Sequence, residues 1–150
     1  MAVELVIKRD YAMDADAHFA RIVRFDELAE AMSSQVRYVG MPDGEAVEGL
    51  SFDLKLYLHG WLPLGHWHID VIERDDTARR LVSREHGGIA KRHDHVLTVK
   101  PLPGAGCRHI DHLIVDAGWL TGFYARSARR IYEKRHDLRT SLRGQTITKA

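Results

Sequence analysis

The C-terminal segment repeats apolar side chains at three- and four-residue steps, which predicts one long amphipathic helix beyond Gly118. Its apolar face is expected to contain Leu120, Phe123, Tyr124, Ser127, Ile131, Leu138 and Leu142. Its solvent face is expected to contain Gly122, Ala125, Arg129, Glu133 and His136. A helix of about 25 residues is roughly 35 to 40 Å long. Because it has a single apolar face, it has to lie across a surface of similar length.

The middle of the chain supplies such a surface, because its apolar residues alternate with polar ones as in β-strands. The clearest alternation is that of Phe52, Leu54, Leu56 and Leu58 with Asp53, Lys55, Tyr57 and His59. Trp67, Ile69 and Val71 repeat the pattern. Further strands are expected at 35–41, 78–85, 93–100 and 107–115, separated by turns rich in Pro, Gly and Asp. Short strands at this spacing predict an antiparallel meander.

The N-terminal segment predicts a strand at 3–11 followed by two short helices. Asp14 is expected to cap the first helix and Asp26 the second. The predicted fold class is therefore α+β, a curved antiparallel sheet of six to seven strands around a long C-terminal helix. No linker, repeat or low-complexity stretch interrupts the sequence, so we expect residues 1–150 to form one domain.

Composition narrows the classes of function. The formal net charge is +1 with His neutral, which gives no electrostatic argument for a nucleic-acid partner. A signal peptide and an uninterrupted apolar stretch of membrane-spanning length are both missing, so we expect a cytoplasmic protein without a membrane span. The single cysteine, Cys107, excludes an internal disulfide. Oligomeric state is left open.

The order of elements is similar to that of the START/SRPBCC superfamily, which includes the birch-pollen-allergen fold, polyketide cyclases and lipid-transfer domains. Three segments contribute most to the resemblance: Ala-Met-Asp-Ala-Asp-Ala-His-Phe at 12–19, Phe-Asp-Glu-Leu at 25–28 and Gly-Trp-Leu-Thr-Gly-Phe-Tyr at 118–124. The resemblance covers nearly the whole chain and implies a helix-grip fold with a ligand cavity. This superfamily has no invariant catalytic motif, so the resemblance assigns no catalytic residue.

A curled sheet closed by a helix predicts a cavity between the two. Its walls are expected to be Phe52, Leu54, Leu56, Leu58, Trp67, Ile69, Val71, His93, His95, Leu97, Leu120, Phe123, Tyr124, Ser127 and Ile131. His93 and His95 are included because they alternate in phase with Leu97, and an imidazole there can move a proton near neutral pH. The predicted partner is a small apolar molecule, resembling a lipid, sterol or polyketide, bound without a cofactor. Cyclase- or dehydratase-like activity is a possible extension of this function.

Two alternatives remain. His66, His68 and Glu73 resemble part of a cupin metal motif and suggest a metal-dependent enzyme. An interaction module is the other alternative, through Tyr57, His59 and His66 on an outer face of the sheet or through the basic residues of the C-terminal helix. Those basic residues, expected to be mainly solvated, are Arg126, Arg129, Arg130, Lys134, Arg135, Arg139 and Arg143. The alternation of the last strand is ambiguous, so His109 and His112 are given no role.

Overall fold

The computed structural model describes residues 1–143 and 147–149. The elements follow in the order β1 (Val3–Tyr11), α1 (Ala15–Ile22), α2 (Phe25–Met32), β2 (Val36–Val39), β3 (Ser51–Leu58), β4 (Leu62–Asp75), β5 (Arg80–Gly87), β6 (Ala90–Pro101), β7 (Cys107–Asp116), the 3-10 turn η1 (Gly118–Leu120), α3 (Thr121–Arg143) and β8 (Ile147–Lys149). The strands form one sheet in the order β2-β3-β4-β5-β6-β7-β1-β8. The expected helix-grip architecture is confirmed, and the three-residue strand β8 is an addition to the predicted meander.

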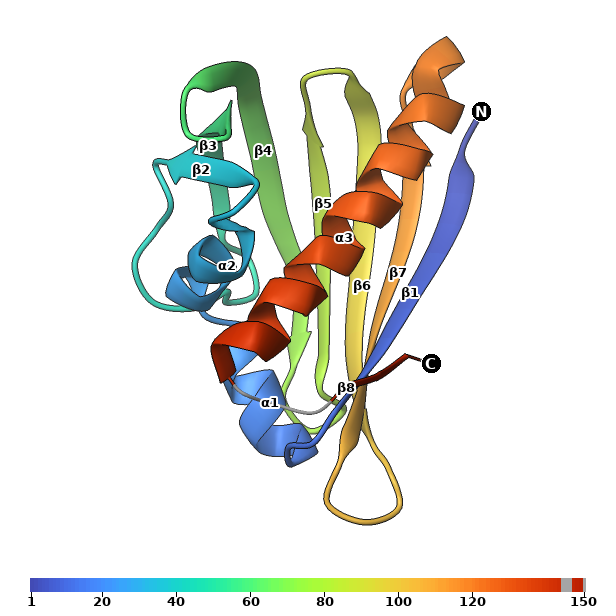
Figure 1. Cartoon of the computed structure of the whole chain (residues 1–150). Coiled ribbons are helices and arrows are strands. Elements are labelled where there is room, and N and C mark those ends of the chain that lie inside the picture. The colour runs from blue at the N-terminus through green and yellow to red at the C-terminus, as the bar shows by residue number, and fades with distance from the viewer. Residues whose placement is uncertain (144–146, 150) are drawn as a thin grey trace.

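The sheet is antiparallel throughout and its register shifts at three places, between Leu56 and Tyr57, between Val71 and Glu73, and between Glu85 and Gly87. Such irregularities bend and twist a strand locally. Figure 1 shows α3 running diagonally across one face of this sheet, with α1 and α2 close to its C-terminal end. The three helices therefore lie on the same side of the molecule as the covered face of the sheet (Figure 1).

The two short helices begin differently. Asp14 caps α1 as predicted, with its carboxylate accepting a hydrogen bond from the Ala17 amide at 3.0 Å. The second predicted cap is wrong, because α2 begins at Phe25 and its capping residue, Arg24, makes no side-chain capping bond. Asp26 lies instead in the first turn of α2, where its carboxylate accepts two hydrogen bonds from the Arg24 guanidinium. A carboxylate in a first helical turn remains favourable because of the helix dipole.

The long helix is present, but its buried stripe differs from the prediction. Ala125 and His136 were assigned to the solvent face, and they are 6% and 0% exposed. Phe123 and Leu142 were assigned to the buried face, and they are 59% and 52% exposed. The buried stripe lies one residue further round the helix, which is about 100° at 3.6 residues per turn. Hydropathy misplaced it because several of the buried side chains are polar.

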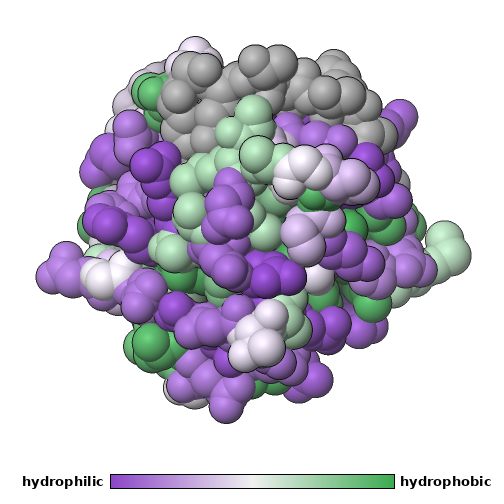
Figure 2. Space-filling model, turned by 90° about the horizontal axis from the view of Figure 1, so that it is seen from below, coloured by the Kyte–Doolittle hydropathy of each residue, from purple (hydrophilic) through white to green (hydrophobic). Residues whose placement is uncertain are grey.

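Figure 2 shows the end of the molecule that is lowest in Figure 1, and hydrophilic residues cover most of the coloured surface there, with hydrophobic residues between them. In the described part of the chain, no helix has the length and apolar character needed to cross a membrane.

Candidate functional site

A cavity of about 460 Å³ lies between the sheet and α3, with part of its wall from α1 and α2. Of the fifteen residues predicted to form the site, twelve line this cavity: Phe52, Leu56, Trp67, Ile69, Val71, His93, His95, Leu97, Phe123, Tyr124, Ser127 and Ile131. The helices α1 and α2 add Ile22, Phe25, Leu28 and Met32. The sequence pattern thus brought together most of the walls from the sheet and α3, but not those from the short helices.

Three predicted residues do not line the cavity. Leu54 is 1% exposed and belongs to the packed interior, although it alternates in phase with Phe52 and Leu56. Leu58 lies at the end of β3, where it pairs with Leu62 beside the β3–β4 turn. Leu120 ends the 3-10 turn before α3 begins. Sequence periodicity therefore does not tell which of the predicted apolar residues border the cavity.

The cavity has a hydrophobic mouth. Leu64, Ile89 and Phe123 line the cavity and are also 43%, 46% and 59% exposed. They come from the first half of β4, the β5–β6 turn and the start of α3, which lie at the upper end of the molecule in Figure 1. A small molecule can therefore reach the interior from this end.

One part of the cavity wall is polar. The Glu85 carboxylate accepts hydrogen bonds from Trp67 Nε1 and Ser83 Oγ, each at 2.7 Å. His93 Nδ1 lies 2.7 Å from the Tyr124 hydroxyl, and its Nε2 lies 3.1 Å from the hydroxyl of Tyr132. These side chains come from β4, β5, β6 and α3, so the polar groups connect the sheet with the helix.

Burial sets the protonation of these groups. Desolvation lowers the pKa of His93 to about 4, so its imidazole is neutral at physiological pH. For Glu85, burial raises the pKa, but the neighbouring His93 and His95 imidazoles and the two hydrogen bonds outweigh it and hold the pKa below its usual value. Burial also raises the pKa of Tyr124, which stays protonated. The wall therefore presents a carboxylate, a neutral imidazole and a phenol.

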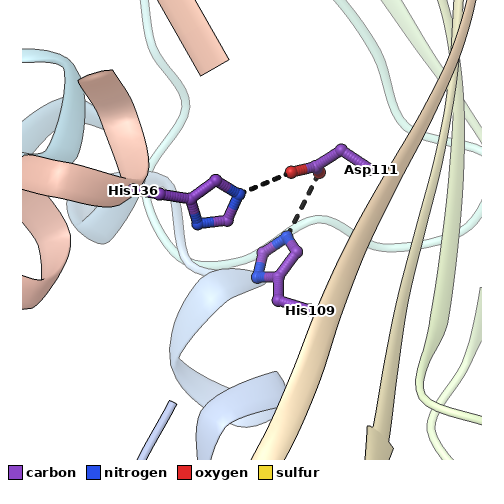
Figure 3. Close-up of side chains that lie close together, drawn as sticks. All are labelled: His109, Asp111 and His136. Carbon is purple, nitrogen blue, oxygen red and sulfur yellow. Dashed lines mark hydrogen bonds and ion pairs between the residues drawn. The ribbon is translucent and has the colours of Figure 1, made fainter. Parts of the chain in front are cut away.

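A second polar group surrounds Asp111, which is 1% exposed and lies at the inner end of the cavity wall. Its Oδ1 is 2.7 Å from His95 Nε2 and 3.2 Å from His109 Nε2, and its Oδ2 is 2.7 Å from His136 Nε2. Figure 3 shows the rings of His109 and His136 approaching the carboxylate from β7 and α3. Three imidazoles from three elements thus share one carboxylate.

The outer ring nitrogens also have partners. His109 Nδ1 lies 3.0 Å from His18 Nε2, and His136 Nδ1 lies 2.5 Å from the Tyr11 hydroxyl. Arg139 Nη1 lies 3.4 Å from the same His136 nitrogen, while its Nε and Nη2 donate to the Glu27 carboxylate at 2.8 and 3.0 Å. The network therefore joins α1, α2 and α3 to the sheet.

The ionisation of this centre follows from burial and hydrogen bonding. Burial raises the pKa of Asp111, but the neighbouring His109 and the bonds from the three imidazoles hold it well below the usual value. Desolvation lowers the pKa of His136 to about 3 and also lowers that of His109. The centre is thus an ionised carboxylate among neutral imidazoles at these two positions.

Sequence reasoning gave His109 no role because both faces of β7 mix polar and apolar residues. In the structure Cys107, His109, Asp111, Leu113 and Val115 are buried. His112 points to the other face and bonds to Glu4. The neighbouring strand resolves the ambiguity only in the structure: His93, His95, Leu97 and Val99 form the buried face of β6, and β6 pairs His95 with Leu113 and Val99 with His109.

The cupin-like alternative is wrong for this fold. Trp67, Ile69 and Val71 face the cavity, so His66 and His68 lie on the other face of β4. There His68 bonds to Asp53 at 2.8 Å and Asp70 at 3.2 Å. In the described part of the chain, the one grouping of His, Cys, Asp or Glu donors close enough to hold an ion is His109, Asp111 and His136.

The basic residues of α3 are not all solvated. Arg126, Arg129, Arg130 and Lys134 are exposed as expected. Arg135 and Arg139 instead line the cavity, and the Arg135 guanidinium lies over the Tyr132 ring, 4.2 Å from its centroid. The side chain of Arg143 lies outside the described residues.

No protein-family model and no curated protein matches the chain. Solved structures do match it in fold. Norcoclaurine synthase from Thalictrum flavum is 12% identical with a TM-score of 0.71, over 95% of this chain and 93% of that one. Protein CV1439 from Chromobacterium violaceum is 12% identical with a TM-score of 0.68, over 93% and 95%. Ara h 8.0201 is 10% identical with a TM-score of 0.66, over 94% and 99%.

Proposed function

We propose that the chain binds one small, largely apolar molecule in the cavity between the sheet and α3. The chain has the helix-grip fold expected from its resemblance to START/SRPBCC proteins. The main observation in support of this proposal is the cavity itself. Its volume of about 460 Å³ lies within the range of about 300 to 1,000 Å³ that ligand sites occupy.

The character of the walls supports a ligand with an apolar body and a polar end. Phe52, Leu56 and Ile69 belong to the apolar part of the wall. Glu85 and His93 lie in the polar part and offer an acceptor and a neutral imidazole. A lipid-, sterol- or polyketide-like molecule that carries a hydroxyl or carbonyl group matches this division.

A panel of neutral apolar fluorescent probes tests the binding function, and one-to-one binding is the expected result. Leu56→Trp places a larger side chain in the cavity and should reduce the affinity at least about tenfold while the protein stays folded. Leu62→Trp is the matched control, because Leu62 is 41% exposed and does not line the cavity. Absence of saturable binding to the wild type, or equal loss in both variants, contradicts the proposal.

Cyclase- or dehydratase-like chemistry is a second candidate, and the group formed by Glu85, His93 and Tyr124 favours it. A carboxylate can remove a proton from carbon next to a carbonyl, and a phenol can donate a hydrogen bond to the resulting enolate. Glu85→Gln should then abolish turnover of a β-polyketone substrate and leave its binding intact. Equal turnover by the wild type and the variant excludes this role for Glu85.

A further inference from the structure

We propose that His109, Asp111 and His136 bind one divalent first-row transition-metal ion at the inner end of the cavity. The site goes beyond the binding function proposed above and is independent of it, because no organic ligand is needed to form it.

The three donors are already close together. One ligand atom from each residue lies within 4.8 Å of the other two. Donors bonded to one metal at about 2.1 Å lie about 3.0 to 3.4 Å apart in octahedral or tetrahedral geometry, so binding requires side-chain movements of up to about 1.5 Å. All three residues are at most 1% exposed, and they come from two elements, β7 and α3, that the fold holds in contact. Two imidazoles and one carboxylate form a ligand set typical of non-haem iron and related sites.

The charge of the centre favours a cation. Asp111 is ionised, and the His109 and His136 imidazoles that bond to it are neutral and so have ring nitrogens able to bind a metal. The Arg139 guanidinium is paired with the Glu27 carboxylate. The Arg135 guanidinium, which lies over the Tyr132 ring, also interacts with the Asp111 charge and offsets part of it. A divalent ion would neutralise the remaining negative charge of the carboxylate.

The surroundings of the rings resemble those of metal ligands, whose second nitrogen is held by a hydrogen bond. His109 Nδ1 has His18 Nε2 as its partner, and His136 Nδ1 has the Tyr11 hydroxyl. When an ion takes the Nε2 atoms, each ring proton moves to Nδ1, where His18 Nε2 and the Tyr11 hydroxyl can accept it. Arg139 Nη1, a donor 3.4 Å from His136 Nδ1, then has to turn away from this nitrogen. Without an ion, the Nε2 protons are donated to Asp111. One set of side chains thus accommodates both states by a change of tautomer.

One side of the centre faces the cavity. His95, His109 and Asp111 line the cavity, whereas His136 lies behind them. A small molecule in the cavity would therefore lie next to two of the proposed ligands, His109 and Asp111. The mixed nitrogen and oxygen donors suit Fe²⁺, Mn²⁺, Co²⁺ or Zn²⁺ better than Ca²⁺ or Cu⁺.

The test uses full-length protein without an affinity tag, stripped with a chelator and titrated with Co²⁺ or Zn²⁺ alone. The expected result is binding of one equivalent, with cobalt absorption bands typical of nitrogen and oxygen ligands. His136→Gln should weaken Co²⁺ binding at least about 100-fold. Tyr11→Phe keeps the ring packing and removes only the hydroxyl next to His136, and should weaken binding about 10- to 100-fold. This second variant keeps the test decisive if His136→Gln does not fold.

The control is the double variant His66→Gln/His68→Gln on the outer face of β4, which should leave the titration unchanged. If wild-type protein binds no stoichiometric metal, or if binding disappears in the control, the proposal is overturned and the centre serves only to anchor the helices. Probe binding measured on metal-free protein separates this outcome from failure of the proposed ligand-binding function.

Discussion

Acidification is expected to destabilise the fold through His93. Its pKa is about 4 in the folded protein because burial opposes the charged form, whereas an unfolded chain has a histidine pKa of about 6.5. Between these two values the unfolded state is protonated at this site and the folded state is not. Protons therefore favour unfolding, so the contribution of His93 is fully present above about pH 6.5 and is lost as the pH falls toward 4.

The size of this loss of stability follows from the difference between the two pKa values of His93. One pH unit corresponds to about 1.4 kcal/mol for one proton, so lowering the pH from 7 to 5 removes about 2 kcal/mol of unfolding free energy through His93. His93 is 4% exposed, and solvent screening should therefore reduce this value little.

Urea unfolding at pH 7, 6 and 5 measures the effect in wild-type protein and in His93→Gln, whose amide cannot titrate. The variant should lose about 2 kcal/mol less than the wild type between pH 7 and 5. His136, with a pKa of about 3, adds a similar loss that both proteins share. His66→Gln is the control for the substitution of a histidine by glutamine, because His66 is exposed. Parallel curves for wild type and His93→Gln would refute the reasoning.

Further substitutions and one labelling experiment test the packing. Gly87→Ala should cost more than about 2 kcal/mol by urea unfolding, because a Cβ would lie 2.1 Å from a backbone oxygen of the adjacent strand. Gly122→Ala, which meets nothing within 4 Å, should stabilise α3 by about 0.5 to 1 kcal/mol, and similar effects of the two changes would contradict the register of β4 and β5. Leu54→Ala should cost about 2 to 5 kcal/mol and Phe123→Ala much less, in accordance with their exposures of 1% and 59%; the reverse order in thermal unfolding is the contrary result. Cys107, fully buried and with its pKa raised by burial to about 11, should react with a thiol reagent at pH 8 only after unfolding, and prompt labelling of native protein would disprove its burial.

The sequence predicted the fold because its strands and its long helix have strong periodicities. Phe52, Leu56 and Trp67 alternate with polar neighbours, and Asp14 precedes an apolar helical pattern, so local rules sufficed for the order of the elements. The start of α2 was less predictable, because Arg24 offers no capping oxygen and Asp26 lies one residue inside the helix.

The polar centre could not be predicted in this way. Alternation places His93 and His95 inward, but burial of His109 and Asp111 is favourable only once His136 and Tyr11 complete their hydrogen bonds. Those partners lie far away in the sequence, and an isolated polar residue reads as solvent-exposed. For the same reason the predicted apolar face of α3 differs from the buried face in the structure. His136 and Arg139 are polar, but they belong to this network and are buried.

The sharing of one carboxylate by three imidazoles has a consequence for how this sequence can diverge. Replacing Asp111 alone leaves three buried ring N–H groups without their acceptor, while replacing one histidine leaves the other two bonds in place. Substitutions at His95, His109 and His136 should therefore be strongly epistatic with those at Asp111, each costing less once the carboxylate has gone. Loss of all three histidines alone would leave the buried carboxylate without these donors, so divergence in this part of the core is expected to change the aspartate and the histidines together.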